Sequence, residues 1–388
     1  MRETITNTIE SARSRLYETS QHIGHHPELG NEEYEARQAL TALLEAYGFT
    51  IEDLPGQPET AFKAVYTAEK PGAHIGFLAE YDALPGLGHA CGHNLIGTQS
   101  AAAAIGYKSI VEQTGGTITV FGTPAEETNG AKVTMAEDGL FDHLDAALMA
   151  HPSSDYVKSG TSLAMDAVEF SFHGRSSHAA AAPEAGINAL DAVLQLFHSV
   201  NALRQHVTPD VRMHGIITHG GTAANVVPEF AQAQFYVRAA KRSSLNPLAE
   251  KVKECARAAA QATGATVEIR NYEYSYDDMK TNEALSNVFT KQLHTLGVRR
   301  EDIFEEEDGS GSLDMGNVSQ RCPALHPYTK ISSKPIIPHT DAFREAALSD
   351  EGFEGMMLTA KALALTAMDV AVNEDVRRAV HREFHASR

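Results

Sequence analysis

Hydrophobic residues recur at three- and four-residue spacing along the first fifty positions, a pattern that predicts two amphipathic helices. Ile5, Ile9 and Leu16 fall on one face of the first helix. Asn31 is expected to cap the second helix and Gly48 to end it, because asparagine and glycine are typical of those positions.

Short apolar runs then alternate with a helical segment, which predicts a mainly parallel sheet. Glu80 follows one of these runs, Glu126 and Glu127 follow the next, and His151 follows the third. Open α/β sheets place their sites at the carboxyl ends of such strands, so a site is expected there. The strands are expected at 62–66, 74–79, 117–121 and 145–150, and the helix at 95–111.

The pattern changes near residue 164, where Val168, Phe170 and Phe172 alternate with polar residues as in a half-exposed antiparallel strand. The order of elements from there is β-α-β-β-α-β, which predicts a ferredoxin-like domain inserted into the first one. Edges of its sheet are natural dimerisation surfaces. Its later elements are expected at 187–203, 211–218, 230–237, 246–263 and 266–272, and helices at 282–296 and 353–370 complete the first domain.

The composition is that of an ordinary soluble globular protein, with 43% of the residues hydrophobic and 21% charged. The length of 388 residues is enough for two domains or one large one. The formal charge of −19 argues against nucleic acid and anionic membranes as partners. Three scattered cysteines do not make a disulfide framework, and no signal peptide or membrane-spanning run is evident. A cytoplasmic location is therefore expected.

Cys91 and His93, separated by one glycine, are both good ligands for a transition metal. The pair alone is a weak signal, but further ligand types recur at Glu126-Glu127, His151 and His339. Together they indicate a hydrolytic metal site. A thiolate ligand suits zinc, whereas carboxylates also suit manganese.

The two adjacent glutamates suggest a division of labour, in which one binds metal and the other acts as general base on a metal-activated water. Simpler interpretations stay open at each position. The glutamates would otherwise be a solvated loop pair, His151 a structural histidine, and Cys91 an inert buried thiol or half of a cysteine–histidine nucleophile.

These motifs resemble the aminoacylase and carboxypeptidase-G-type metallopeptidase superfamily. The resemblance is to its amidohydrolase branch, with hippurate hydrolase, indole-acetyl-amino-acid hydrolase and aminobenzoyl-glutamate hydrolase. The matching segments run nearly end to end: 26–30, 80–85, 89–94, 124–127, 150–152, 174–178, 186–191, 220–228, Arg238, 314–319 and His339.

The resemblance implies a fold, a set of roles and a partner. The fold would be α/β, a metal-binding domain over 1–163 and 277–388 with a mixed, mainly parallel sheet, and an inserted ferredoxin-like α+β lid or dimerisation domain over 164–276. Two divalent ions, zinc or manganese, would be held by Cys91, His93, Glu127, His151 and His339. Glu126 would be the general base, and Asp82 would support the site. His178 would polarise the scissile carbonyl by reaching the neighbouring subunit's site in a homodimer. Asn225 and Arg238 would hold the substrate's carboxylate.

Two departures from the residues usual in this branch narrow the resemblance to one sub-branch. Much of the branch has aspartate at the positions of Glu80 and Asn94. With these two residues and the segment 314–319, the chain looks like the sub-branch of aminobenzoyl-glutamate hydrolase and a dipeptidase acting on basic dipeptides. The expected function is metal-dependent hydrolysis of the amide bond of N-acyl, aminobenzoyl or aminoacyl amino acids. A dipeptidase is the alternative within the enzyme class, and a non-catalytic protein that binds amino-acid conjugates is the alternative outside it.

Overall fold

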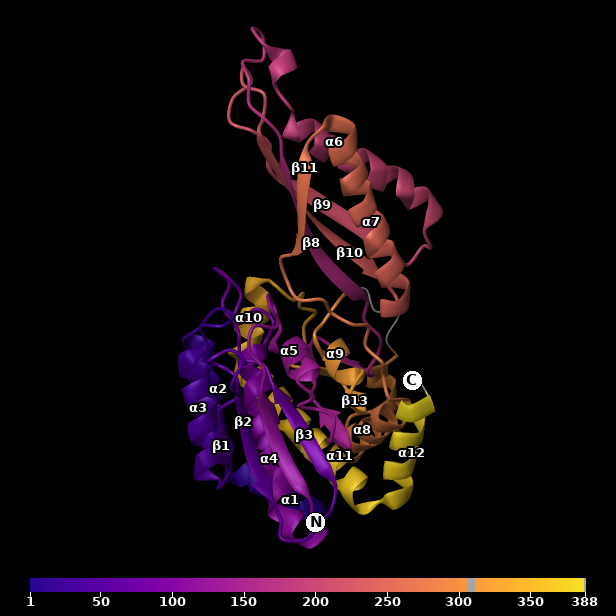
Figure 1. Ribbon diagram of the computed structural model, residues 1–388. Helices are drawn as coiled ribbons and strands as arrows, with labels where there is room; N and C mark the ends of the chain where they lie inside the picture. The colour runs from indigo at the N-terminus through magenta and orange to yellow at the C-terminus, as the bar shows by residue number, and fades with distance from the viewer. Residues whose placement is uncertain (306–310, 387–388) are drawn as a thin grey trace. The chain divides into compact units, whose positions relative to one another are not determined.

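Figure 1 shows the computed structural model, which describes residues 1–305 and 311–386. The chain forms two compact units, each with its own hydrophobic core. Unit 1 comprises Met1–Thr161, Met279–Gly309 and Asp314–Arg388, and unit 2 comprises Ser162–Asp278 and Ser310–Leu313.

The main sheet of unit 1 has six strands in the order β1-β2-β4-β3-β5-β13. The β4-β3, β3-β5 and β5-β13 pairs are parallel, and the β1-β2 and β2-β4 pairs are antiparallel. The predicted α/β class with a mixed, mainly parallel sheet is confirmed. Its strands are β1 (Thr50–Glu52), β2 (Phe62–Thr67), β3 (His74–Ala79), β4 (Thr117–Gly122), β5 (Ala146–Leu148) and β13 (Ala324–Leu325).

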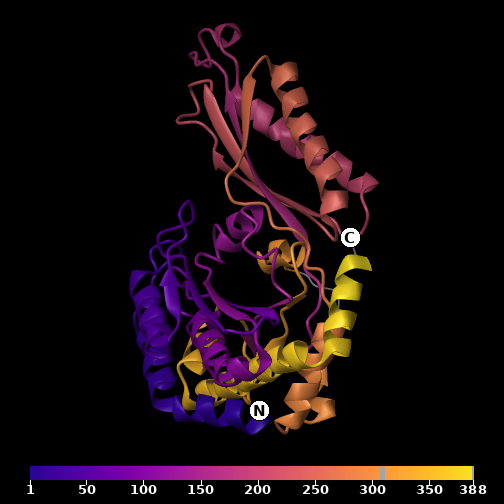
Figure 2. The same cartoon turned by 60° about the horizontal axis from the view of Figure 1, so that its bottom comes forward.

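Helices pack around this sheet, and their small and aliphatic residues are fully buried there. The Ala-rich helix α4 (His93–Thr114) contacts both α1 (Arg2–Ser11) and α11 (Asp350–Val372), so a helix from the N-terminal part of the chain and one from its C-terminal part share one core (Figure 2). The other helices of unit 1 are α2 (Arg13–His25), α3 (Tyr34–Ala46), α5 (Ala131–Glu137), α8 (Glu283–Thr295), α9 (Met315–Ser319), α10 (Asp341–Ala347) and α12 (Glu374–Ala386).

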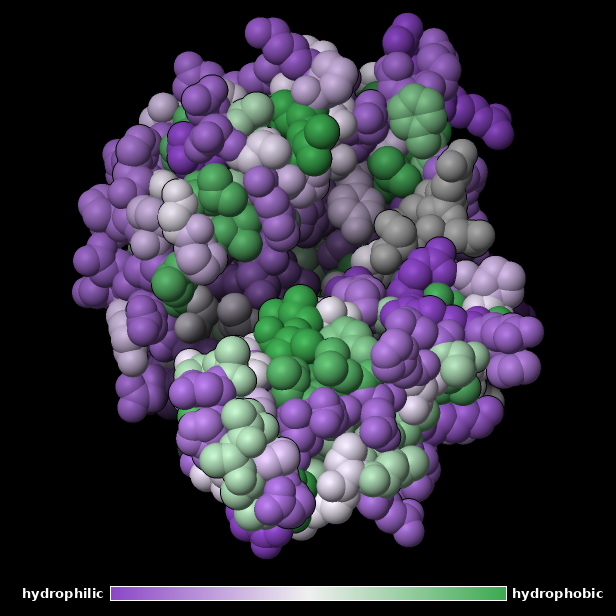
Figure 3. All heavy atoms as spheres, turned by 90° about the horizontal axis from the view of Figure 1, so that it is seen from above, coloured by the Kyte–Doolittle hydropathy of each residue, from purple (hydrophilic) through white to green (hydrophobic). Residues whose placement is uncertain are grey.

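Helix α11 is long and apolar enough to cross a membrane by length and composition, although the sequence pattern predicts no such run. Within the fold, 72% of its apolar window is buried, which is typical of a core helix. Hydrophilic residues predominate on the face seen in Figure 3, and hydrophobic residues gather there in a few patches.

Unit 2 is an antiparallel sheet in the order β11-β8-β10-β9 covered by two helices, the ferredoxin-like arrangement that the sequence predicts. The apolar faces of α6 and α7 pack on β10, which lies in the middle of the sheet. Strand β9 is at the edge. The elements are β8 (Ala164–His173), α6 (Ala189–Leu203), β9 (Arg212–His219), β10 (Phe230–Ala239), α7 (Arg242–Thr263) and β11 (Thr266–Asn271).

Several boundaries differ from the sequence prediction. The first predicted helix is two, α1 and α2, which meet at Ala12. Strand β5 ends at Leu148, and His151 begins a strand of a separate small sheet in the order β12-β7-β14-β6. That sheet consists of β6 (His151–Ser153), β7 (Tyr156–Val157), β12 (Ile303–Phe304) and β14 (Tyr328–Lys330).

The prediction that Asn31 caps the second helix is wrong. Helix α3 begins at Tyr34, and Asn31 lies in a turn with φ of 67°. The backbone N–H groups of Glu35 and Ala36 instead donate to the carboxylate of Glu28, each at 3.0 Å. A carboxylate from an earlier loop thus satisfies the first turn of the helix and complements its dipole.

We expect Glu28→Ala to lower the free energy of unfolding by roughly 1–2 kcal/mol, because it leaves two N–H groups of the first turn without their acceptor. Urea unfolding of the purified variant measures this effect. Glu45→Ala, at an exposed site near the other end of α3, is the control and should change stability by less than about 0.5 kcal/mol. Equal effects of the two substitutions would contradict the capping role.

Candidate metal centre

The carboxyl ends of β3, β4 and β5 lie at one edge of the main sheet, because these strands are parallel. The segment after β3 carries Glu80 and Asp82, and the loop after β4 carries Glu126 and Glu127. His151 follows β5. The polar residues that follow separate strands in the sequence therefore lie together in unit 1.

Two turns in the left-handed backbone region direct side chains into this place. Ala125 has φ of 62° immediately before the glutamate pair, and its N–H donates to the Glu33 carboxylate at 2.8 Å. His339 has φ of 63°, and its N–H donates to the Ala90 carbonyl at 2.9 Å. Such conformations are uncommon in non-glycine residues and cluster at functional sites.

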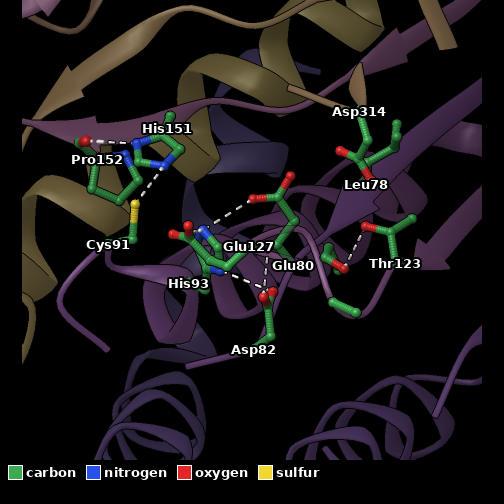
Figure 4. Close-up of polar contacts among 12 residues, drawn as sticks. Leu78, Glu80, Asp82, Cys91, His93, Thr123, Glu127, His151, Pro152 and Asp314 are labelled. Atoms are coloured by element: carbon green, nitrogen blue, oxygen red, sulfur yellow. Dashed lines mark hydrogen bonds and ion pairs between the residues drawn. The ribbon is translucent and has the colours of Figure 1, made fainter. Parts of the chain in front are cut away.

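The five residues predicted to bind metal come together here (Figure 4 shows four of them). Cys91 Sγ lies 3.5 Å from His151 Nε2, and His339 Nε2 lies 3.3 Å from Glu127 Oε1. Three overlapping groups have all their ligand atoms within 4.8 Å of one another: Cys91, His93 and His151; Cys91, Glu127 and His339; and His93, Glu126 and Glu127.

Asp82 orients two of these residues. His93 Nδ1 donates to Asp82 Oδ1 at 3.0 Å, and the Glu127 N–H donates to Asp82 Oδ2 at 3.0 Å. With Nδ1 occupied, the other ring nitrogen of His93 is left for a ligand, as is usual for a metal-binding histidine with a carboxylate behind it. This geometry suits the supporting role predicted for Asp82.

The donor set fits divalent cations. The buried atoms His93 Nε2 and Glu127 Oε1 have no hydrogen-bond partner within residues 1–305 and 311–386, a costly state that a metal ion would relieve. Burial raises the pKa of the Cys91 thiol to about 12 and lowers the pKa of His151 to about 3. An ion pair of thiolate and imidazolium is therefore disfavoured, which argues against the cysteine–histidine nucleophile.

Glu126 differs electrostatically from its neighbour. Desolvation of its carboxyl group, and then the negative charges of Glu80 and Glu127, raise the pKa of Glu126 well above its ordinary value. A carboxyl group with a raised pKa is suited to take up a proton near neutral pH and to release it again.

The three residues predicted to contact substrate belong to unit 2. His178 lies in an exposed loop, where its Nδ1 accepts the N–H groups of Ala180 and Ala181 at 3.2 Å each. That loop pairs with the Asn225 loop, because the Ala179 N–H donates to the Asn225 carbonyl at 3.0 Å.

Arg238 lies elsewhere in unit 2. The His178 and Asn225 loops flank the end of β10 that begins at Phe230, whereas Arg238 is eight residues further along the strand. At about 3.3 Å per residue, this places it roughly 26 Å from Phe230. Within one subunit, Asn225 and Arg238 are therefore too far apart to hold the same small carboxylate.

Sequence reasoning missed two polar residues near the centre, Glu33 and Lys132. Glu33 is fully buried, and its carboxylate accepts from the Thr60 hydroxyl at 2.8 Å and from the Ala125 N–H. Lys132 is fully buried between the carboxylates of Glu80 and Asp314. The one hint in the sequence was a lysine among the mostly apolar residues of 131–136. The contacts themselves join residues that are distant in sequence.

Asn94, whose role the sequence leaves open, is structural. Its side-chain amide is fully buried and donates to the carbonyls of Ser20, at 3.4 Å, and Ala347, at 3.2 Å. It thereby joins α4 to α2 and α10.

The pKa of Glu33 provides a test of its burial. Burial, and then the negative charge of Asp82, raise this pKa from 4.5 to about 7. The folded state therefore binds the proton more tightly, so the contribution to stability is complete below pH 4.5 and is lost as the pH rises to about 7.

We expect the chelator-treated wild type to lose roughly 2–3 kcal/mol of unfolding free energy through this group over that interval. Glu33→Gln, which is neutral throughout, should lose correspondingly less. Urea unfolding at several values between pH 4.5 and 8 compares the two proteins. Parallel pH profiles would show that Glu33 does not titrate with a raised pKa.

The chain is similar to known hydrolases over most of its length. The family profile of the peptidase dimerisation domain matches residues 164–264. The chain is 38% identical to the Xaa-Arg dipeptidase of Mus musculus over 394 residues, covering 97% of this chain and 90% of the mouse protein. It is 35% identical to one subunit of the p-aminobenzoyl-glutamate hydrolase of Escherichia coli K12, covering 76% of this chain and 65% of that protein.

The fold is also that of a dinuclear metal-binding peptidase of the M20 family from Bacillus subtilis, with a TM-score of 0.65, 21% identity, and coverage of 93% of this chain and 99% of that one. The chain belongs to the M20 family of metallopeptidases and, within it, to the branch of the Xaa-Arg dipeptidase and aminobenzoyl-glutamate hydrolase. It is a metal-dependent hydrolase of linear amide bonds, and the resemblance found in the sequence is confirmed.

Proposed function

We propose that this enzyme is a homodimer with two divalent ions per subunit, and that it cleaves the amide bond preceding an amino acid with a free carboxylate. Dipeptides are the first substrates to consider. The observation that carries the proposal is the convergence beside Glu126 of Cys91, His93, Glu127, His151 and His339. Two of their buried ligand atoms, on His93 and Glu127, have no hydrogen-bond partner among the described residues.

When bound, divalent ions lower the pKa of a coordinated water towards about 7 and polarise the scissile carbonyl. Glu126 takes the proton of the attacking water and passes it to the leaving amine, for which its raised pKa is suited. Asp82 keeps His93 and Glu127 in their orientations through its two hydrogen bonds.

His178 stabilises the negative charge that develops on the carbonyl oxygen. Because its Nδ1 accepts two backbone N–H groups, its proton is carried by Nε2, which is then a donor for an oxyanion. Asn225 lies in the loop before β10, whereas Arg238 is near the far end of that strand. This separation supports binding of the substrate's carboxylate by residues of two subunits.

Unit 2 offers a surface for the dimer. Strand β9 is at the edge of its sheet and exposes Ile216 by 62% and Ile217 by 41%. Edge strands and exposed aliphatic side chains are common in subunit interfaces. Unit 2 then acts as the lid and dimerisation domain, and unit 1 as the catalytic domain.

Dipeptides with a basic C-terminal residue are favoured over N-acyl amino acids. The identity to the Xaa-Arg dipeptidase extends over more of both chains than the identity to the aminobenzoyl-glutamate hydrolase. The net charge of −19 also attracts cationic substrates.

The test is the release of free amino acid by chelator-stripped protein, with and without added manganese or zinc. Its substrates are dipeptides ending in arginine or alanine, N-acetyl amino acids, hippurate and aminobenzoyl-glutamate. We expect turnover only with metal, and the highest kcat/KM for dipeptides ending in arginine. Preference for an N-acyl or aminobenzoyl substrate would assign an acylase, and metal-independent turnover would overturn the proposal.

A further inference from the structure

Glu80 is not among the predicted ligands, yet one of its oxygens faces them. The side chain is 2% exposed and follows the last residue of β3. Its Oε1 accepts from Lys132 Nζ at 2.7 Å. Its Oε2 is buried, has no hydrogen-bond partner among the residues that the structure describes, and lies 3.4 Å from His93 Nε2. Figure 4 shows this contact.

The separation of 3.4 Å fits two ligands of one metal ion. Donors held at about 2.1 Å in near-tetrahedral geometry lie about 3.4 Å apart. The predicted ligand pairs have the same spacing, 3.5 Å for Cys91 with His151 and 3.3 Å for His339 with Glu127.

A direct hydrogen bond explains the contact less well. A charge-assisted bond from an imidazolium to a carboxylate is about 2.7–2.9 Å long, clearly shorter than the contact of Glu80 with His93. In the part of the chain that the structure describes, neither atom has a hydrogen-bond partner, so a cation between them would satisfy two buried groups.

Lys132 and Asp314 hold Glu80 in this position. Lys132 Nζ also donates to Asp314 Oδ1 at 2.7 Å, and Asp314 Oδ2 accepts from the Lys132 N–H at 3.3 Å. Lys132, Glu80 and Asp314 are all buried, so the group carries two carboxylates for one ammonium. The remaining negative charge, next to Glu126 and Glu127, is costly unless cations compensate it.

We propose that Glu80 is a further protein ligand of the metal ion bound through His93, and that Lys132 and Asp314 are the positioning residues that direct its free oxygen. This inference rests on the proposed two-metal function. It gives the two ions different surroundings, because Glu80 adds a carboxylate to the group of His93, Glu126 and Glu127, whereas the group of Cys91, His93 and His151 offers sulfur and nitrogen. The carboxylate-rich position favours manganese and the thiolate position favours zinc.

The test is metal binding by chelator-stripped wild type, Glu80→Gln and the control Glu169→Gln. Glu169 is also almost fully buried and pairs with Arg270, but it lies in unit 2. Titration with manganese, followed by the paramagnetic signal of the free ion, gives stoichiometry and affinity. The visible absorption of the cobalt-loaded proteins reports the coordination of each site.

We expect Glu80→Gln to weaken the binding of one of the two metal ions by roughly 10–100-fold and to change the cobalt spectrum, while the affinity for the other ion stays the same. Glu169→Gln should bind as wild type. If Glu80→Gln does not fold, Glu80→Asp serves instead, since it keeps the charge but cannot reach both Lys132 and the metal.

Affinities within about twofold of wild type and an unchanged cobalt spectrum would overturn the role of Glu80 and leave the two-metal function standing. A wild type that binds no metal would overturn both.

Discussion

Glu126→Gln is expected to lower kcat by roughly 1,000-fold while the protein keeps its fold and its metal ions. Glutamine has nearly the same shape, but it cannot take a proton from water and return it to the leaving amine. Because the pKa of Glu126 is raised well above its ordinary value, replacing it by a neutral group should not destabilise the protein. The measurements are kcat on the best dipeptide, metal content by elemental analysis, and thermal unfolding.

Glu127→Gln is the matched comparison, because the two residues are adjacent but differ in their predicted roles. Its carboxylate oxygen lies 3.3 Å from His339 Nε2, so we expect the Glu127 variant to lose metal. If Glu126→Gln loses metal and Glu127→Gln keeps it, the two roles are reversed. If Glu126→Gln retains wild-type kcat with metal bound, Glu126 is not the general base.

His151→Ala is expected to weaken the binding of one metal ion by roughly 100-fold or more, and to reduce turnover at limiting metal. His151 Nε2 is one of the three ligand atoms in the group with Cys91 and His93, and alanine leaves a vacant position there. Excess metal should restore part of the activity, since the remaining ligands stay in place.

His143→Ala is the control, because His143 is exposed and is not among the predicted ligands. Both variants are dialysed against chelator, reloaded, and compared by metal content and activity. A full complement of tightly bound metal in His151→Ala would remove His151 from the ligand set.

The sequence by itself determined the larger elements of the fold and indicated the candidate ligands. Strand β3 was predicted at its observed bounds, 74–79, since a short apolar run that ends at charged residues has few other interpretations. Cys91, His93, the glutamate pair and His151 are candidates from the sequence because each lies beside a strand or helix end that the pattern predicts. Elements of two or three residues, such as β6 and β13, were missed because so short a segment has no periodicity.

Only the tertiary structure decided which polar groups face one another. Asn31 had the residue type of a helix cap, but Glu28 reaches the N–H groups of α3 because its loop returns past the helix. The contact of Lys132 with Asp314 joins residues 182 positions apart, and that of Glu80 with His93 depends on how β3 meets α4. Local patterns predict a residue's own element, whereas pairing between distant residues follows from packing, which hydrophobic periodicity does not encode.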